Sequence, residues 1–280
     1  MKKYLQLIRV KHWIKNILIF IPLICSGLLT YNNLLLCICG FFAFNFVSSF
    51  IYIINDIKDI EKDKLHPRKK ERPLASGKIK KKTAIIIAII MVILAITINS
   101  VIMKSIFNIP LIFLIAYIII NIFYSCGFKN IAIVDIVLLA TGFVLRIYYG
   151  ASIIGIEVSN WLFLTIMSAS LFLGLGKRKK ELINNKESRK VLKEYNEAFL
   201  DKFQYLCLTL TIVFYSLWTI EQDIKYLSFS IPILIIIFMK YSLNIEKNNE
   251  GDPTTILYQD KILLLLCFVY GIIMLAFMVI

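Results

Sequence analysis

The segment INDIKDIEKDKLHPRKKERPLASGKIKKK, residues 54–82, decides the fold because it is a charged insert between apolar runs long enough to cross a membrane. Such runs of about 18–22 residues recur along the chain, and helices of that length span the ~30 Å hydrocarbon core of a bilayer. The 280 residues are 59% hydrophobic, whereas a soluble domain is about 45–50% apolar. A β-barrel would need strands of ~10 residues with alternating polarity instead of uninterrupted apolar runs. The sequence therefore predicts an all-α, polytopic membrane protein.

Nine membrane spans are expected, of which the sixth is short. They cover residues 13–29, 34–54, 83–101, 107–125, 131–151, 161–176, 203–220, 226–243 and 261–280. If successive spans alternate in direction, 29 of the 32 lysines and arginines fall on one side of the membrane, two fall on the other, and Arg146 lies inside a span. Because cytoplasmic loops are rich in Lys and Arg, this places the N-terminus and the loops 55–82 and 177–202 in the cytoplasm, as in a bacterial-type inner membrane. We expect residues 1–280 to form one transmembrane domain.

The net charge of +14 is explained by the same distribution, so it gives no reason to expect a nucleic acid as partner. The six cysteines lie in or at the edge of apolar runs and form no CxxC pair. They are interpreted as small apolar side chains rather than as disulfide partners or metal ligands.

The acidic part of the segment, NDIKDIEKD, carries four oxygen donors of interest at the boundary of the second span, namely Asn55, Asp56, Asp59 and Asp63. If that helix continues, Asn55, Asp59 and Asp63 share one face at intervals of four residues, and Asp56 lies one turn before Asp59. Such oxygen donors suit Mg²⁺, which binds a few carboxylates together with water and phosphate oxygens. A solvated helix end with surface ion pairs is the alternative. We favour Mg²⁺ on Asn55, Asp59 and Asp63, with Asp56, Asp59 and Asp63 in catalysis, because basic residues follow at once.

The basic part, HPRKKERP at residues 66–73, is suited to bind phosphate beside that metal. Its two prolines bracket a rigid turn that can direct Arg68 and Arg72 back toward the aspartates, and arginine makes bidentate contacts with phosphate. Arg72 is therefore assigned to both substrate binding and catalysis. His66 is suited either to contact phosphate or to stabilise the turn, and both interpretations stay open.

The stretch NDIKDIEKDKLHPRKKERPLASG resembles the first aspartate-rich motif, NDxxDxxxD, of the UbiA superfamily of intramembrane prenyltransferases. The resemblance implies a helical bundle around a central cavity that faces the cytoplasm, with Mg²⁺-dependent transfer from a diphosphate donor. The superfamily has a second DxxxD motif after its sixth span. Here the corresponding loop reads LGLGKRKKEL at residues 173–182, which argues against an ordinary aromatic prenyltransferase.

One branch of the superfamily, the decaprenyl-phosphate phosphoribosyltransferases, is similar in three further stretches. They are RVKHWIKN at residues 9–16, YSCGFKNIAIVDIVLLATGFVLRIYYGA at 124–151, and LGLGKRKKEL. This resemblance covers roughly residues 5–182. It implies phosphoribosyl pyrophosphate as the donor and a polyprenyl phosphate as the acceptor.

Polar residues within the spans are further candidates for substrate contact. Lys15 and Asn16 lie inside the first apolar run and match the WxKN pattern of that branch. Asp135 and Arg146 lie in the fifth span, where charges are costly unless they face a polar cavity or a partner. Since about 16 Å of helix separates them, they are not expected to pair with each other. We expect both to line the cavity, with Arg146 opposite a phosphate and Asp135 orienting a basic group or a ribose hydroxyl; buried charges satisfied by other helices are the alternative.

The remaining predicted substrate contacts are Tyr124, Lys129, Lys177, Arg178 and Glu181. Tyr124 and Lys129 are expected at the cytoplasmic mouth of the cavity. Lys177 and Arg178 follow two glycines that let the backbone approach an anionic group, so we expect them to bind phosphate in place of the missing aspartates. The next two lysines, at positions 179 and 180, are interpreted as membrane anchors.

Two other functions stay open. A UbiA-type prenyltransferase would take its pyrophosphate on an isoprenoid and use an aromatic or other acceptor, and the first motif does not separate the two activities. A lipid or solute transporter often shows internal repeats and broken helices, but no clear repeat is visible here. The sequence leaves open the lipid chain length, the number of metal ions and whether the chain forms a homo-oligomer. It assigns no role to residues 183–202 and 246–260.

Overall fold

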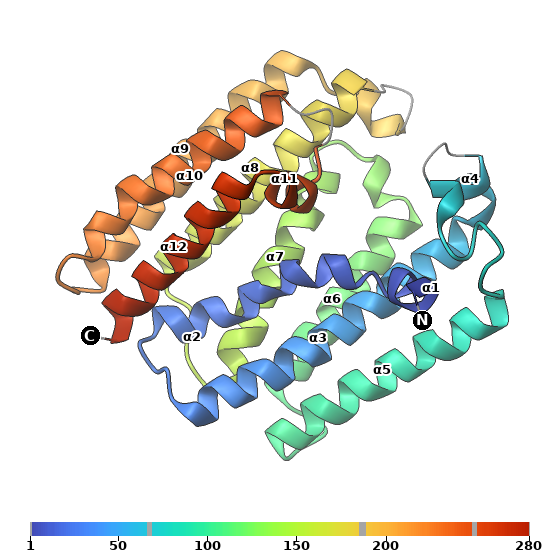
Figure 1. The fold of residues 1–280 in the computed structure, drawn as a ribbon, viewed down its shortest axis with the longest axis horizontal. Coiled ribbons are helices and arrows are strands. Elements are labelled where there is room, and N and C mark those ends of the chain that lie inside the picture. The colour runs from blue at the N-terminus through green and yellow to red at the C-terminus, as the bar shows by residue number, and fades with distance from the viewer. Residues whose placement is uncertain (1, 66–68, 185–188, 248–250, 280) are drawn as a thin grey trace.

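The computed structural model describes residues 2–65, 69–184, 189–247 and 251–279, and the regular structure in these ranges is helical (Figure 1). The α-helices are α1 (Lys2–Leu7), α2 (Ile21–Cys25), α3 (Tyr31–Lys58), α4 (Ile60–Lys64), α5 (Lys81–Met103), α6 (Ile109–Cys126), α7 (Val134–Ile153), α8 (Asn160–Asn184), α9 (Glu197–Glu221), α10 (Ser230–Lys247), α11 (Pro253–Gln259) and α12 (Lys261–Val279). The 3₁₀ helices are η1 (Val10–Phe20), η2 (Lys69–Glu71), η3 (Phe128–Asn130), η4 (Lys190–Lys193) and η5 (Leu227–Phe229). His66 and Arg68, both predicted to lie in the site, fall outside the described residues.

Seven helical segments in the described ranges are long and apolar enough to cross a bilayer. They are α3, α5, α6, α7, α9, Leu227–Lys247 (which contains α10) and most of α12. The two other expected spans coincide with η1 plus α2 and with α8, whose last part carries the charged sequence GKRKKEL. The total of nine spans and their orientation in the membrane therefore stay predictions.

Short polar side chains set several helix starts. Thr30, Asn108 and Asn196 precede α3, α6 and α9, and each accepts a hydrogen bond from a backbone N–H of the first turn. Such caps satisfy N–H groups that have no partner within the helix.

The end of α3 determines how the acidic motif is presented. The helix is interrupted at Asp59, which has φ −98° and ψ 11°, and α4 begins one residue later. The Asp59 N–H still bonds to the Asn55 carbonyl at 3.0 Å, and the Asp63 N–H bonds to the Asp59 carbonyl at 2.8 Å. The three residues therefore remain in successive turns, in spite of the local break.

The helices pack in two groups around α7. Figure 1 shows α9, α10 and α12 along one edge of the molecule and α5 along the opposite edge. One buried cluster joins η1, α3, α6 and α7, and another joins α8, α9 and α10. Gly150 of α7 lies directly on η1, since an added Cβ would be 2.1 Å from the Ile19 carbonyl oxygen. Small residues allow this close approach of backbones in membrane helices, and it brings η1 to the centre of the bundle.

Candidate active site

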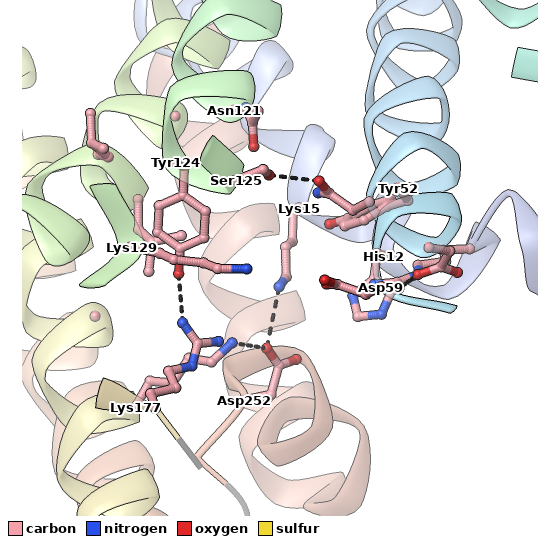
Figure 2. Close-up of a pocket in the computed structure, with 18 of the residues that line it drawn as sticks. His12, Lys15, Tyr52, Asp59, Asn121, Tyr124, Ser125, Lys129, Lys177 and Asp252 are labelled. Carbon is pink, nitrogen blue, oxygen red and sulfur yellow. Dashed lines mark hydrogen bonds and ion pairs between the residues drawn. The ribbon is translucent and has the colours of Figure 1, made fainter. Parts of the chain in front are cut away.

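A cavity of about 650 Å³ lies among η1, α3, α4, α6, α7 and α8. Its lining residues range from Arg9 to Pro253, so segments far apart in the sequence share one site (Figure 2). Basic side chains outnumber acidic ones among the described residues that line it. The acidic residues are Asp56, Asp59, Asp63 and Asp252. This positive excess suits a polyanionic ligand.

One side of the cavity, which we call the aspartate wall, is formed by Asp56, Asp59 and Asp63. Asp56 and Asp63 are each only 3% exposed, and both accept hydrogen bonds from Nη1 of Arg72, at 3.2 and 2.7 Å. Arg9, which precedes η1, also donates to Asp56. Buried carboxylates are costly without a counter-charge, and the two arginines supply it.

The aspartate wall fits Mg²⁺ in its donor chemistry. Asn55 lines the cavity as well, and its Oδ1 accepts a hydrogen bond from Ser125 Oγ at 2.6 Å. Within the described ranges, no three His, Cys, Asp or Glu side chains are grouped closely enough to hold a metal by themselves. Mg²⁺ takes one or two carboxylates and completes its octahedron with water and phosphate oxygens. Asp56 and Asp63 share one guanidinium nitrogen, which shows that two carboxylates converge on a single cationic group here.

The basic wall consists of Lys129, Lys177, Arg189 and Lys190. Figure 2 shows Lys129 and Lys177 on the side of the cavity away from Asp59. This wall belongs to the loop before α7, to α8 and to the connection after α8. It therefore places the basic sequence after the sixth expected span across the cavity from the aspartates.

Arg178, the neighbour of Lys177, does not line the cavity. Its side chain has no exposed surface, and it donates to the carboxylates of Asp135 and Glu181. Asp135 is also fully buried and accepts a second hydrogen bond from the Tyr195 hydroxyl at 2.7 Å. From the sequence, Asp135, Arg178 and Glu181 are expected to contact the substrate directly. In the structure they lie behind the basic wall and do not line the cavity. Successive residues of an α-helix point about 100° apart, so Lys177 faces the cavity while Arg178 faces α7.

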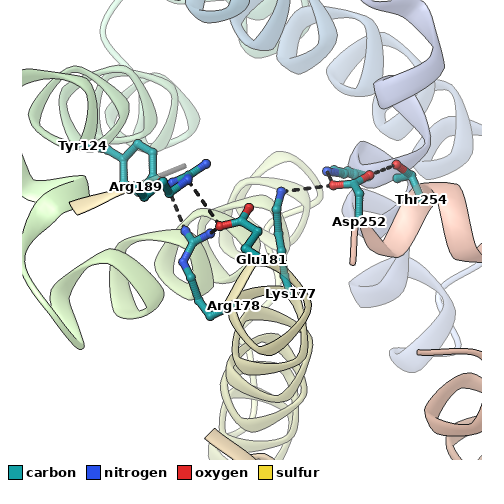
Figure 3. Close-up of polar contacts among 8 residues, drawn as sticks. Tyr124, Lys177, Arg178, Glu181, Arg189, Asp252 and Thr254 are labelled. Atoms are coloured by element: carbon teal, nitrogen blue, oxygen red, sulfur yellow. Dashed lines mark hydrogen bonds and ion pairs between the residues drawn. The ribbon is translucent and has the colours of Figure 1, made fainter. Parts of the chain in front are cut away.

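Arg178 and Arg189 share two partners, the Tyr124 hydroxyl and the Glu181 carboxylate (Figure 3). The Tyr124 hydroxyl accepts from Arg178 Nη2 at 3.1 Å and from Arg189 Nη1 at 2.8 Å. Glu181 accepts from Arg178 Nη1 at 2.6 Å and pairs with Arg189 Nε at 3.3 Å. Arg189 is therefore fixed on the cavity wall by residues of α6 and α8, which are themselves fixed by the buried Arg178–Asp135 pair.

Asp252, in the connection between α10 and α11, pairs with two lysines of the cavity (Figure 2). Its Oδ1 accepts from Lys15 Nζ at 3.4 Å and from Lys177 Nζ at 3.2 Å, and the Thr254 hydroxyl donates to its Oδ2. Burial alone would raise the pKa of Asp252, but the positive charges of Lys177 and Lys15 outweigh this and lower the pKa below its ordinary value. Gly251 rests on α8, where an added Cβ would lie 3.1 Å from the Lys177 carbonyl oxygen. The connection thus carries an ionised carboxylate into the cavity.

Arg146 of α7 lines the cavity from inside the bundle. Its Nε donates to Asn16 Oδ1 at 2.6 Å, its Nη2 donates to the Tyr117 hydroxyl at 3.1 Å, and its Nη1 donates to the Gly142 carbonyl. Asn16 is 1% exposed and is not among the lining residues, so it orients Arg146 instead of facing the cavity. Arg146 and Asp135 have separate partners, as their spacing along the helix predicts.

The profile of the UbiA prenyltransferase family matches residues 18–266 of the chain. The chain belongs to this family. It is similar to the decaprenyl-phosphate phosphoribosyltransferase of Corynebacterium glutamicum, at 28% identity over 96% of this chain and 85% of that protein. The enzyme of the same name from Mycobacterium tuberculosis strain H37Rv is 28% identical over 94% of this chain and 90% of its own length.

Solved structures of low sequence identity share the fold of this UbiA family member. A UbiA homolog from Archaeoglobus fulgidus, bound to GPP and Mg²⁺, aligns with a TM-score of 0.74 at 21% identity and covers 98% of this chain and 99% of that one. A structure of digeranylgeranylglyceryl phosphate synthase aligns with a TM-score of 0.71 at 22% identity, covering 99% of this chain and 98% of that one. These likenesses confirm the predicted UbiA-like helical bundle.

Lys179 and Lys180 of this UbiA family member are not membrane anchors, so that prediction is wrong. They are 4% and 6% exposed. Lys179 Nζ lies 2.7 Å from carboxylate oxygens of both Asp201 and Glu246, and Lys180 Nζ donates to the Glu246 carbonyl at 3.1 Å. A buried ammonium group needs such partners. The two lysines therefore connect α8 to α9 and α10.

Several residues of the cavity are not among those predicted from the sequence, and the charged ones include Arg9, Arg189, Lys190 and Asp252. Arg9 opens the RVKHWIKN stretch, and the resemblance of that stretch to the family is the signal that points to it. Arg189 and Asp252 belong to polar connections without a recognised motif. The only local indication at Asp252 is its position between glycine and proline, which favours a fixed turn.

Proposed function

We propose that this UbiA family member transfers 5-phosphoribose from phosphoribosyl pyrophosphate to a polyprenyl phosphate and releases pyrophosphate. The observation that carries the proposal is the basic wall across the cavity from the aspartate wall. A prenyl diphosphate is anionic at one end only, whereas phosphoribosyl pyrophosphate carries phosphate on both sides of its ribose. Two groups of phosphate-binding residues match the second donor better. The relatives named decaprenyl-phosphate phosphoribosyltransferase, which align along most of the chain, support the same reaction.

In this proposal the pyrophosphate of the donor binds at the aspartate wall. Asn55, Asp59 and Asp63 would hold Mg²⁺, which when bound neutralises charge on the leaving pyrophosphate. Arg72 is close enough to the aspartates to bind the same phosphates through its guanidinium. The basic wall would then bind the 5-phosphate of the donor. Asp135, Arg178 and Glu181 act as positioning residues, because they reach the substrate only through Tyr124 and Arg189.

The transfer exchanges one bond at the anomeric carbon of ribose. The bond from C1 to the pyrophosphate oxygen breaks, and a bond from C1 to an oxygen of the lipid phosphate forms. The carbon becomes oxocarbenium-like, as in other glycosyl transfers. The lipid phosphate is already ionised near neutral pH, so no side chain has to remove a proton from it. The protein contributes position and electrostatic stabilisation, and Arg146 is assigned to the acceptor phosphate.

The acceptor is a lipid, so we further propose that the protein lies in the inner membrane of a bacterial-type cell with the cavity on the cytoplasmic side. The distribution of lysine and arginine supports this orientation, with 29 residues on one side and two on the other.

The decisive experiment incubates purified protein with Mg²⁺, labelled phosphoribosyl pyrophosphate and a polyprenyl phosphate. A labelled lipid product is expected from the wild type. Asp59→Ala should reduce its formation by about 10²–10³-fold, as loss of one preorganised electrostatic group typically does. Glu157→Ala is the matched control, because Glu157 is exposed in the connection between α7 and α8 and does not line the cavity. Release of pyrophosphate from prenyl diphosphates alone, with no labelled lipid, would show that the donor is an isoprenoid.

A further inference from the structure

Asp252 lines the cavity but has no role in the proposed transfer of phosphoribose. Within the described residues it is the one carboxylate that lines the cavity outside the aspartate wall. It stands among basic residues in a cavity suited to anions, where a negative charge weakens the binding of phosphate. Its side chain is 23% exposed, so part of it remains open to a ligand.

The hydrogen bonds of Asp252 restrict what that ligand group can be. An ionised carboxylate accepts hydrogen bonds and donates none, and it has about four lone-pair sites. Two bonds from Lys15 and Lys177 reach Oδ1, and one bond from Thr254 reaches Oδ2. One acceptor site is left for a neutral or positive donor group. Phosphate oxygens are excluded because they are acceptors themselves.

The place of Asp252 is fixed by the chain around it. Gly251 lies against the backbone of α8, and Pro253 begins α11 and lines the cavity. The Thr254 hydroxyl donates a hydrogen bond to the Asp252 carboxylate. Lys15 and Lys177, the two lysines beside it, come from η1 and α8. A group bound at Asp252 therefore lies beside two cations, which suits a sugar that carries phosphates.

We propose that Asp252 accepts a hydrogen bond from a ribose hydroxyl of the donor and so selects a sugar diphosphate over a prenyl diphosphate. Carboxylates recognise ribose hydroxyls in the same way in dinucleotide-binding proteins. A prenyl diphosphate has no hydroxyl group and would leave the carboxylate without its partner. This inference rests on the proposed function and adds the residue that identifies the sugar.

The test compares ribose 5-phosphate with its 2-deoxy and 3-deoxy analogues as competitors of labelled phosphoribosyl pyrophosphate. The wild type is expected to prefer ribose 5-phosphate over at least one analogue by about tenfold, the value of one hydrogen bond to a charged group. Asp252→Asn should abolish that preference. Thr254→Val keeps the charge of Asp252 but removes the hydrogen bond that holds its carboxylate. It should reduce the preference for ribose 5-phosphate by about threefold. Asp260→Asn is the matched control, because Asp260 pairs with Lys240 and Asn244 outside the cavity.

Inorganic pyrophosphate is the second probe, since it has no hydroxyl and reports both folding and anion binding. It should bind to all variants, and more tightly to Asp252→Asn, whose lysines lose an internal counter-charge. If Asp252→Asn keeps the hydroxyl preference, or tightens both sugar phosphates and pyrophosphate equally, Asp252 is only an internal counter-ion and the inference is wrong. If the wild type transfers no phosphoribose at all, it is the proposed function that fails.

Discussion

Replacing Asp135 with Asn removes the negative charge that faces Arg178 inside the bundle. Both side chains have no exposed surface, and Asp135 accepts from Arg178 Nε and from the Tyr195 hydroxyl. After the substitution, Arg178 keeps its ion pair with Glu181 but loses its fully buried partner. Behind the basic wall, Arg178 then has one carboxylate partner instead of two.

The expected loss in the free energy of unfolding follows from the burial of this ion pair. Breaking a buried ion pair by removing one partner destabilises a protein by about 3–5 kcal/mol. The Asn side chain retains one oxygen that accepts a hydrogen bond, so the lower end, about 3 kcal/mol, is expected for Asp135→Asn. Arg178→Met should cost a similar amount. In the double variant the two losses should not add, and the coupling should reach about 2–3 kcal/mol, as for residues in one network.

The assay is unfolding of the detergent-solubilised protein, combined with the KM for phosphoribosyl pyrophosphate. Arg178→Met should lower stability and also raise KM, because Arg178 orients the groups that hold Arg189. The double variant should be about as stable as either single variant, and its KM should stay raised. Additive losses of stability would refute the coupling. A raised KM for Arg178→Met with unchanged stability would show that Arg178 binds the substrate directly.

Three further predictions test the packing, the walls of the cavity and the titration of its carboxylate. Gly150→Ala should lower stability by about 1–3 kcal/mol, because its Cβ would lie 2.1 Å from a carbonyl oxygen of η1, whereas Gly271→Ala, with nothing within 4 Å, should be neutral in the same unfolding assay. Lys177→Met should raise the KM for the donor by about tenfold, and Lys179→Met, two positions away but turned from the cavity, should leave it unchanged. The pKa of Asp252 is lowered on folding, so its ion pairs stabilise the protein above the unfolded pKa of about 3.9 and are lost as the pH falls through the folded pKa. The stability gap between the wild type and Asp252→Asn, measured by unfolding at each pH, should therefore stay constant from about pH 8 to 5 and close only below about pH 4.

The sequence predicts the helical membrane fold and the acidic half of the site because both depend on local properties. An apolar run of sufficient length is a membrane helix wherever it occurs, and the expected spans coincide with helices in the structure. Asn55, Asp59 and Asp63 reach the cavity together because they are neighbours in successive turns of one helical stretch. Local spacing is enough to place such a group.

The basic half of the site could be predicted only in part. The sequence places Lys177 at the cavity, where the structure also has it, but it groups Arg178 with Lys177 and assigns Lys179 and Lys180 to the membrane surface. Which of four consecutive basic residues faces the cavity depends on how α8 is rotated against α7, α9 and α10. That rotation is set by ion-pair partners such as Asp135 and Asp201, which come from other helices.

By itself, the amino-acid sequence therefore determined the membrane helices, their expected sidedness and the aspartate wall. Only the tertiary structure decided that Arg178 supports the site from behind, that Arg189 belongs to the basic wall and that Asp252 enters the cavity. The physical reason is distance along the chain. Asp252 pairs with Lys15, which is 237 residues away in the sequence. This contact forms only when segments near the two ends of the chain come together, so no local pattern of hydropathy or charge predicts it.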